Sequence, residues 1–245
     1  MDVIGCGVFS MCSAGTAALG AWQLQRRREK VAQIEARRAQ LDGDAIPLTD
    51  RPVLWSKVAL PPGRYDRQQF LVGPRGGPST IATDHGSSGI STGGLGYQII
   101  APFTASDGSV YLVNRGWCQR KSASLGLESL ADEPIAGQVG VARPYERILG
   151  SAPPPSNIFV SMDAPEMMSR ISPDSQTDFF VDLLESNGNS VGGVLHRKRI
   201  DDFLHFPTSP EKHVAYAFTW FALSAAVATM TVIRFRKRSK QTFSR

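Results

Sequence analysis

Charged residues are missing from two long stretches of this chain, one near each end. Val214 to Ile233 contains no Asp, Glu, Lys, Arg or His. About 20 helical residues at 1.5 Å each reach the roughly 30 Å of a bilayer's hydrocarbon core. Val3 to Gln25 is uncharged as well, and basic residues follow both stretches directly, as is typical of a helix that ends at a lipid surface. The pattern therefore predicts two membrane-spanning helices.

The first uncharged stretch differs from a secretory signal that is later removed. Only Asp2 precedes it, and its basic residues lie on the far side, whereas a signal peptide begins with a basic region. The stretch is rich in glycine and alanine, and small residues four positions apart let helix backbones approach closely. We therefore expect this helix to pack against protein, as one half of a hairpin of two anchors.

Between the two stretches the apolar residues form short runs separated by Gly, Pro, Ser and Asp, which is typical of an antiparallel sheet or barrel. The runs are Val53 to Leu60, Phe70 to Val72, Tyr97 to Phe103, Val110 to Asn114, Val139 to Arg143, Asn157 to Met162, Phe179 to Leu184 and Val191 to Leu195. One helix is predicted from Ala164 to Ile171, because Asp163 and Glu166 form a capping-box pattern.

The predicted fold class is a membrane-anchored α+β protein, in which two transmembrane helices flank a β-rich, mostly antiparallel soluble domain. Its parts are a first transmembrane helix (1–25), a helical extension (26–42), the β-rich domain (43–208), a second transmembrane helix (209–235) and a basic tail (236–245).

Charge and composition exclude several functions. The net charge of +5 includes about +3 from 26–30 and about +6 from 234–245, so the rest of the chain carries about −4 and offers no basic face for nucleic acid. The 3 cysteines form no CxxC pair, which argues against a zinc site or a disulfide framework. GSSG at 86–89 lacks the spacing of a nucleophile elbow, and GGLG at 93–96 lacks the context of a dinucleotide fingerprint. We expect no enzymatic activity.

Several motifs resemble the Surfeit locus protein one family of cytochrome c oxidase assembly factors. They are LGAWQLQRRREK (19–30), GRYD (63–66), VGPR (72–75), GYQIIAPF (96–103), LVNRGW (112–117) and the group His213, Tyr216, Thr219, Trp220 and Phe221. The chain departs from the family pattern at Glu29, where an aromatic residue is usual, and at Cys118-Gln119, where Val-Pro is usual.

The resemblance implies a biogenesis factor of complex IV that aids insertion of haem a or stabilises an early assembly intermediate of the catalytic subunit. It implies that the partners are cytochrome c oxidase subunits, chiefly the haem-bearing one, together with membrane lipid. It also implies a place in the mitochondrial inner membrane with both termini in the matrix, or in the plasma membrane of a bacterium. The alternative is a stoichiometric structural subunit that is retained in mature complex IV or in a respiratory supercomplex.

His213 is the candidate ligand for haem a, taken as a transient cofactor. Ser209 is a good N-cap and Pro210 suits the first helical position, so His213 falls at the end of the first turn. The partial positive charge of a helix N-terminus disfavours imidazolium, and neutral imidazole is the form that ligates haem iron. With the resemblance, His213 is predicted to bind the iron.

The expected surroundings of His213 come from both spans. Tyr216 and Trp220 follow it on the same face, and Trp22 with Gln23 reaches a similar depth if the spans run antiparallel. Arg26 is a candidate for binding an anion such as a haem propionate or a lipid phosphate. The alternative is an interfacial aromatic belt with a collar of snorkelling arginines, without haem.

Two polar motifs of the middle region each permit a plain structural interpretation. Asn114, Arg115 and Trp117 of LVNRGW could contact a partner subunit or face the haem pocket. Otherwise the run is a strand end, where Gly116 permits a turn, Trp117 packs and Arg115 meets a buried carboxylate. The HRKR run at 196–199 is expected to be the charged end of an edge strand.

Overall fold

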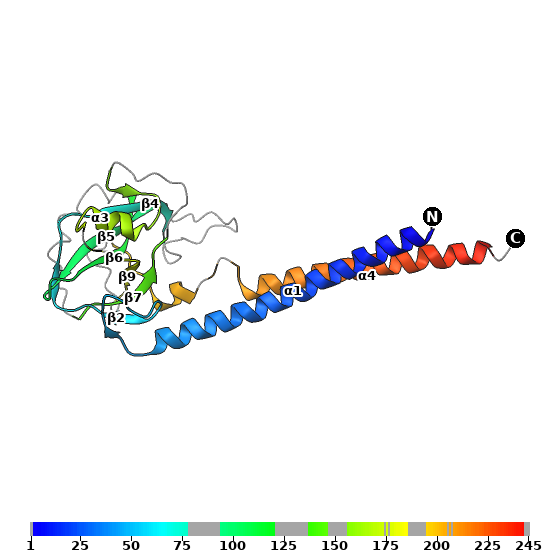
Figure 1. The fold of residues 1–245 in the computed structure, drawn as a ribbon, viewed down its shortest axis with the longest axis horizontal. Coiled ribbons are helices and arrows are strands. Elements are labelled where there is room, and N and C mark those ends of the chain that lie inside the picture. The colour runs from blue at the N-terminus through cyan, green and yellow to red at the C-terminus, as the bar shows by residue number, and fades with distance from the viewer. Residues whose placement is uncertain are drawn as a thin grey trace. The chain divides into compact units, whose positions relative to one another are not determined.

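The computed structural model divides the chain into two compact units, Met1–Arg37 with Leu204–Arg245 and Arg38–Phe203 (Figure 1). The residues that it describes are 2–77, 94–120, 137–146, 156–173, 175, 177–185, 195–204, 206 and 208–242, without side chains at 2–4 and 235–242. Most of the expected strand Val191 to Leu195 lies outside these residues, as does the GSSG run at 86–89.

The first unit is a pair of long helices. Helix α1 runs without interruption over Asp2–Asp42, so the expected helical extension at 26–42 is its second half. Helix α4 covers Pro210–Thr242. The two helices lie side by side in Figure 1 and run antiparallel, because hydrogen bonds join Ser13 to Ser224 and Gln23 to His213.

The contact between the helices follows a regular seam. On α4 the less exposed positions are 213, 217, 220, 224, 227 and 231, and on α1 they include 13, 16, 20 and 23. Steps of three and four residues keep one face of a helix turned toward its partner, as in a left-handed coiled coil. Gly20 lies in this seam against the ring of Phe221, since a Cβ on it would be 2.8 Å from that ring.

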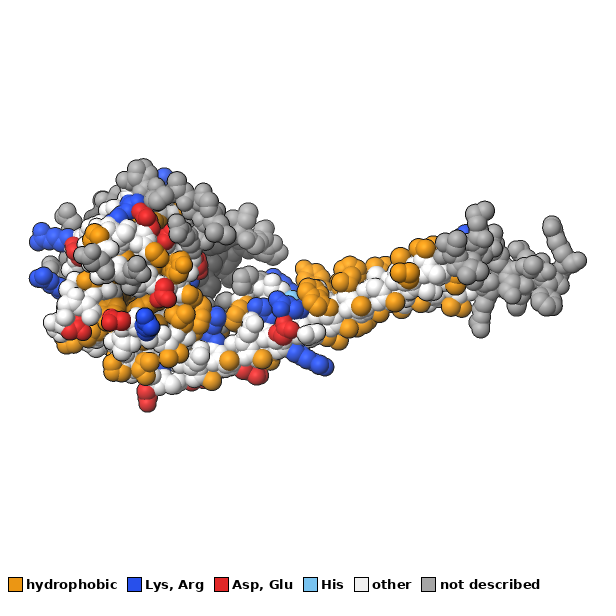
Figure 2. Space-filling model, viewed as in Figure 1, with side chains coloured by type: hydrophobic (Ala, Val, Ile, Leu, Met, Phe, Trp, Pro, Cys, Tyr) orange, Lys and Arg blue, Asp and Glu red, His pale blue; other side chains and the backbone are white. Residues whose placement is uncertain are grey.

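Only one of the described helices is long and apolar enough, by length and composition, to cross a membrane. It is the stretch Pro210–Arg234 of α4. The corresponding half of α1 consists largely of Gly, Ala, Ser and Thr, which are less hydrophobic than the Val, Phe and Leu of α4. Large apolar side chains such as Phe218 and Met230 are exposed on the helix pair, and Figure 2 shows hydrophobic groups along its length.

The second unit is built on one mixed nine-stranded sheet with the order β1-β2-β7-β9-β6-β5-β4-β8, in which β3 also pairs with β5. The strands are β1 (Ile46–Pro47), β2 (Lys57–Ala59), β3 (Gly63–Tyr65), β4 (Phe70–Gly76), β5 (Leu95–Ala105), β6 (Val110–Gln119), β7 (Val139–Pro144), β8 (Ile158–Phe159) and β9 (Phe179–Leu183). Three pairs are parallel, namely β1 with β2, β4 with β8 and β6 with β9. The other five pairs are antiparallel, so the described sheet is mixed and, as expected, mostly antiparallel.

Both faces of this sheet are buried. Along β6, Tyr111 and Val113 belong to one apolar cluster and Leu112 to another, as the alternation of side chains along a strand requires. Helix α3 (Ala164–Ser169) adds Met167 and Met168 to the second cluster. The backbone N–H of Glu166 donates to the Asp163 carboxylate at the start of α3, as the sequence predicted.

The hairpin from β5 to β6 carries the LVNRGW motif. Its turn closes at Gly108, which has a φ of +88° that glycine adopts without steric cost. Farther along β6, Ile99 pairs with Gly116 while Ile100 pairs with Asn114, so Arg115 is the extra residue of a β-bulge. The motif therefore bends the middle of a strand, and the expected strand end at Asn114 is wrong.

Candidate functional site

His213 lies in the seam between α1 and α4, where it meets the side chain of Gln23. The imidazole Nδ1 is 2.7 Å from the Gln23 Oε1, and both side chains are partly buried. This confirms that the two residues reach the same depth on antiparallel helices. Among the contacts of the described residues, Nε2 of His213 has no hydrogen-bond partner.

The predicted aromatic neighbours of His213 divide into two groups. Trp220 is one of the less exposed positions of the seam, two turns along α4 from His213. Trp22 and Tyr216 are 51% and 53% exposed, so they lie on the outer surface of the helix pair and not between the helices. The structure therefore joins His213 to Gln23 but does not enclose them in a ring of aromatic side chains.

Arg26 lies one turn beyond Trp22 on α1 and is exposed. Its guanidinium forms an ion pair with Glu29 of the same helix at 2.6 Å. Ion pairs between exposed side chains contribute little stability, so this pair can open without much cost when another anion approaches. Both interpretations of Arg26, as an anion ligand and as part of a basic collar, are compatible with this position.

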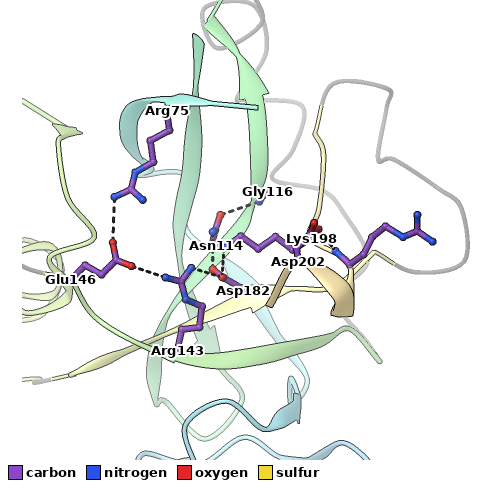
Figure 3. Close-up of polar contacts among 9 residues, drawn as sticks. Arg75, Asn114, Gly116, Arg143, Glu146, Asp182, Lys198 and Asp202 are labelled. Atoms are coloured by element: carbon purple, nitrogen blue, oxygen red, sulfur yellow. Dashed lines mark hydrogen bonds and ion pairs between the residues drawn. The ribbon is translucent and has the colours of Figure 1, made fainter. Parts of the chain in front are cut away.

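A second polar cluster lies inside the β-rich unit, around the carboxylate of Asp182 on β9 (Figure 3). Its Oδ1 accepts a hydrogen bond of 2.7 Å from Asn114 Nδ2. Its Oδ2 accepts from Arg143 Nη1 at 2.9 Å and from Lys198 Nζ at 2.6 Å. Asp182 is 1% exposed. Its carboxylate is held by three donors, which come from β6, β7 and the segment at 195–199.

The charges around Asp182 determine its protonation. Burial by itself would raise the pKa of this carboxyl, but the positive charges of Lys198 and Arg143 outweigh burial and lower the pKa to about 2. The pKa of Arg143 is raised by Asp182, against the effect of its own burial. An acid that stays ionised and fully hydrogen-bonded is a weak base, so this cluster is suited to holding strands together and not to proton transfer.

The cluster accounts for the LVNRGW motif. Asn114 bridges from Asp182 to the backbone N–H of Gly116, which donates to its Oδ1 at 3.1 Å. Arg115 lies with its guanidinium 4.4 Å from the ring centroid of Tyr65, and the Trp117 indole donates to the carbonyl of Arg75. Asn114, Arg115 and Trp117 are 2%, 0% and 5% exposed, so they lie inside the domain and a docking surface made of these side chains has no support in the structure.

The sequence predicted a buried carboxylate as the partner of Arg115. The buried carboxylate beside the motif is Asp182, and the structure shows its contact with Asn114, whereas Arg115 lies over the ring of Tyr65. No local pattern could predict the contact between Asn114 and Asp182, because the two residues are 68 positions apart and are brought together by the parallel strands β6 and β9. The expectation that the HRKR run is the charged end of an edge strand is also wrong. Lys198 turns toward Asp182, and Arg197 is buried, so the run does not form a solvated end of an edge strand.

A small cavity of about 180 Å³ adjoins the Asp182 cluster. It is lined by Gly76, Gly77, Gln98, Asn114, Gly116, Trp117, Asp182, Leu183, His196, Arg197, Lys198 and Asp202. Among the described residues there is no group of three or more His, Cys, Asp or Glu side chains that could hold a metal ion. The buried thiol of Cys118 has a raised pKa because burial disfavours the thiolate.

Comparison with known proteins supplies the family. The model of the SURF1 family matches residues 10–225, which include most of α1, the whole β-rich unit and the first half of α4. A SURF1-like protein of Rickettsia bellii is 25% identical over 228 residues, covering 90% of this chain and 86% of the relative. Surfeit locus protein 1 of Rattus norvegicus is 26% identical over 234 residues (90% and 72%), and that of Xenopus tropicalis is 28% identical over 237 residues (91% and 73%). The chain belongs to the SURF1 family.

Proposed function

We propose that this chain is an assembly factor for cytochrome c oxidase that holds haem a at His213 while the catalytic subunit of the oxidase matures. Membership of the SURF1 family implies the role in oxidase assembly. The haem-binding part is supported by one observation: the hydrogen bond between His213 and Gln23 occupies Nδ1 and leaves Nε2 available to a metal.

The residues around His213 would suit a haem that takes one nitrogen ligand from this chain. A bound haem a supplies an iron that accepts an imidazole nitrogen and a macrocycle that needs apolar cover. His213 is the nitrogen ligand, and Trp22 and Tyr216 offer exposed aromatic surface on the two helices near it. Arg26 provides a cation for a propionate if its exposed pair with Glu29 opens.

We place both helices in a membrane, the mitochondrial inner membrane or the plasma membrane of a bacterium. The span Pro210–Arg234 supports this placement by its length and composition. The contacts of Ser13 with Ser224 and of Gln23 with His213 support it for α1, since they keep the first half of α1 level with that span. With two spans, both termini lie on one side, and the β-rich domain lies on the other.

The test is the haem content of the purified full chain. Wild-type protein, produced in cells that synthesise haem a and purified in detergent, should show haem absorbance, and His213→Ala should lose it. His196→Ala is the matched control, because it removes another histidine that lies in the β-rich unit, and its haem content should equal that of wild type. Wild-type protein that is free of haem under these conditions would contradict the haem-binding role.

A second measurement separates an assembly factor from a permanent oxidase subunit. Membranes are solubilised, fractionated on native gels and analysed by mass spectrometry. An assembly factor should migrate with incomplete oxidase intermediates at less than one copy per oxidase. Co-migration with the mature oxidase at one copy each would instead show the structural subunit that the sequence left as the alternative.

A further inference from the structure

We infer that Gln23 is a positioning residue, which fixes the tautomer and the orientation of His213 so that Nε2 points its lone pair outward. The inference rests on the proposed haem-binding role and extends it from the ligand to the residue that prepares it. It comes from the contact between the two helices, since the Gln23 Oε1 lies 2.7 Å from His213 Nδ1.

The chemistry of this contact determines where the imidazole proton lies. A carbonyl oxygen can only accept a hydrogen bond, so Nδ1 must carry the proton that it donates to Oε1 of Gln23. In neutral imidazole the other nitrogen then has a free lone pair. Metal-ligating histidines commonly donate their second ring N–H to a carbonyl or carboxylate in this way.

The position of Gln23 makes this contact firm. Gln23 continues the α1 seam that contains Ser13 and Gly20, where Ser13 bonds reciprocally with Ser224 and Gly20 packs against Phe221. These contacts hold the helices in one register, and that register keeps the amide of Gln23 opposite the imidazole. The bond is partly buried, and a hydrogen bond in a site of lower dielectric constant is stronger than the same bond in bulk solvent.

The first test uses the protein without haem. The full chain, labelled with ¹⁵N-histidine and held in detergent micelles, contains 4 histidines, and the signal of His213 is identified by its loss in His213→Ala. We expect a protonated Nδ1 and a pyridine-like Nε2 in wild type, and in Gln23→Leu a shift toward the Nε2-protonated form. A protonated Nε2 in wild type, or a tautomer unchanged in Gln23→Leu, would overturn the inference.

The second test measures haem affinity by titration. Loss of an outer hydrogen bond to a metal ligand costs roughly 10- to 100-fold in affinity, so Gln23→Leu should weaken binding by that factor. Gln23→Glu should keep the haem affinity near that of wild type, because a carboxylate accepts the same proton. Thr229→Ala is the control: it removes a hydrogen bond within α4, on an exposed face away from His213, and it should change neither the affinity nor the tautomer.

The outcomes separate this inference from the proposed function. If His213→Ala loses haem while Gln23→Leu retains wild-type affinity and tautomer, Gln23 has no positioning role but the haem role stands. If wild type binds no haem although the tautomer depends on Gln23, the haem role fails while the effect of Gln23 on the imidazole is upheld. Equal weakening by Gln23→Leu and Gln23→Glu would show a role in helix packing alone and contradict the inference.

Discussion

At the scale of single residues, Asp182 shows how one buried charge can organise several strands. Removing a carboxylate from water is costly unless its oxygens are hydrogen-bonded and its charge is balanced. Asn114, Arg143 and Lys198 meet both conditions. Arg143 also reaches Glu146, whose other oxygen lies 3.5 Å from Arg75, so the ion pairs extend from the interior to the surface. The cluster therefore joins segments far apart in the sequence.

Replacing Asp182 by Asn should destabilise the β-rich unit strongly, because the largely buried Arg143 and Lys198 would lose their shared counter-charge. Breaking a buried pair in this way typically costs about 3 kcal/mol or more, which corresponds to a fall of roughly 10 °C in Tm for a unit of this size. Thermal unfolding of the full chain in detergent, followed by tryptophan fluorescence, measures the change. Glu146→Gln, whose carboxylate is half exposed, is the control and should cost less than about 1 kcal/mol.

Stability should also fall in acid through this carboxylate. Its pKa is lowered from 3.8 to about 2 in the folded state. The ionised carboxylate therefore stabilises the fold fully at a pH above its unfolded-state pKa. This stabilisation is lost as the pH falls through its folded-state pKa. The shift corresponds to about 2 kcal/mol. The Tm difference between wild type and Asp182→Asn, measured from pH 6 to pH 2, should narrow below pH 4, and a constant difference would argue against this origin.

At the scale of elements, the seam between α1 and α4 depends on small residues at particular positions. A Cβ added to Gly20 would lie 2.8 Å from the ring of Phe221, whereas one added to Gly15 would have nothing within 4 Å. Both glycines lie in the same apolar half of α1, and only one of them contacts α4. This difference provides a matched pair for testing the helix contact.

Gly20→Leu should separate the helices, while Gly15→Leu should leave them paired. The readout is a disulfide between Ser13→Cys and Ser224→Cys, whose hydroxyls lie 3.1 Å apart, in a chain with its native cysteines replaced. We expect the cross-linking yield to fall several-fold with Gly20→Leu and to recover when Phe221→Ala is added, because the smaller side chain makes room. An equal loss with Gly15→Leu would show that the register differs from the one described.

The sequence predicted helices and strands better than it predicted which of them contact one another. Apolar runs located seven of the nine strands, and the capping pattern located α3. The strands β1 and β3 were missed because two or three residues carry too little periodicity. The β-bulge at Arg115 and the bond from Asn114 to Asp182 depend on pairing between distant strands, which no local pattern records. The meeting of His213 and Gln23 was predictable, because antiparallel spans of similar length bring those depths together.

At the scale of the whole molecule, the question is whether α1 shares the membrane with α4. Composition alone favours only Pro210–Arg234, since the first half of α1 is rich in small and hydroxylated residues. The contacts within the helix pair favour both helices. Along the helix axis, Gln23 lies opposite His213 and Ser13 lies opposite Ser224. In this register Met11 lies opposite the middle of the α4 span.

Cysteine labelling of intact membranes can decide this. In a chain without native cysteines, Met11→Cys lies on an exposed outer face of α1, and Ala36→Cys lies on an exposed position of its second half. If the first half of α1 is in lipid, a membrane-impermeant maleimide should label Ala36→Cys from the side of the β-rich domain and should reach Met11→Cys only after denaturation. Equal labelling of both positions would place α1 in water, and the haem site proposed at its contact with α4 would then lie outside the bilayer as well.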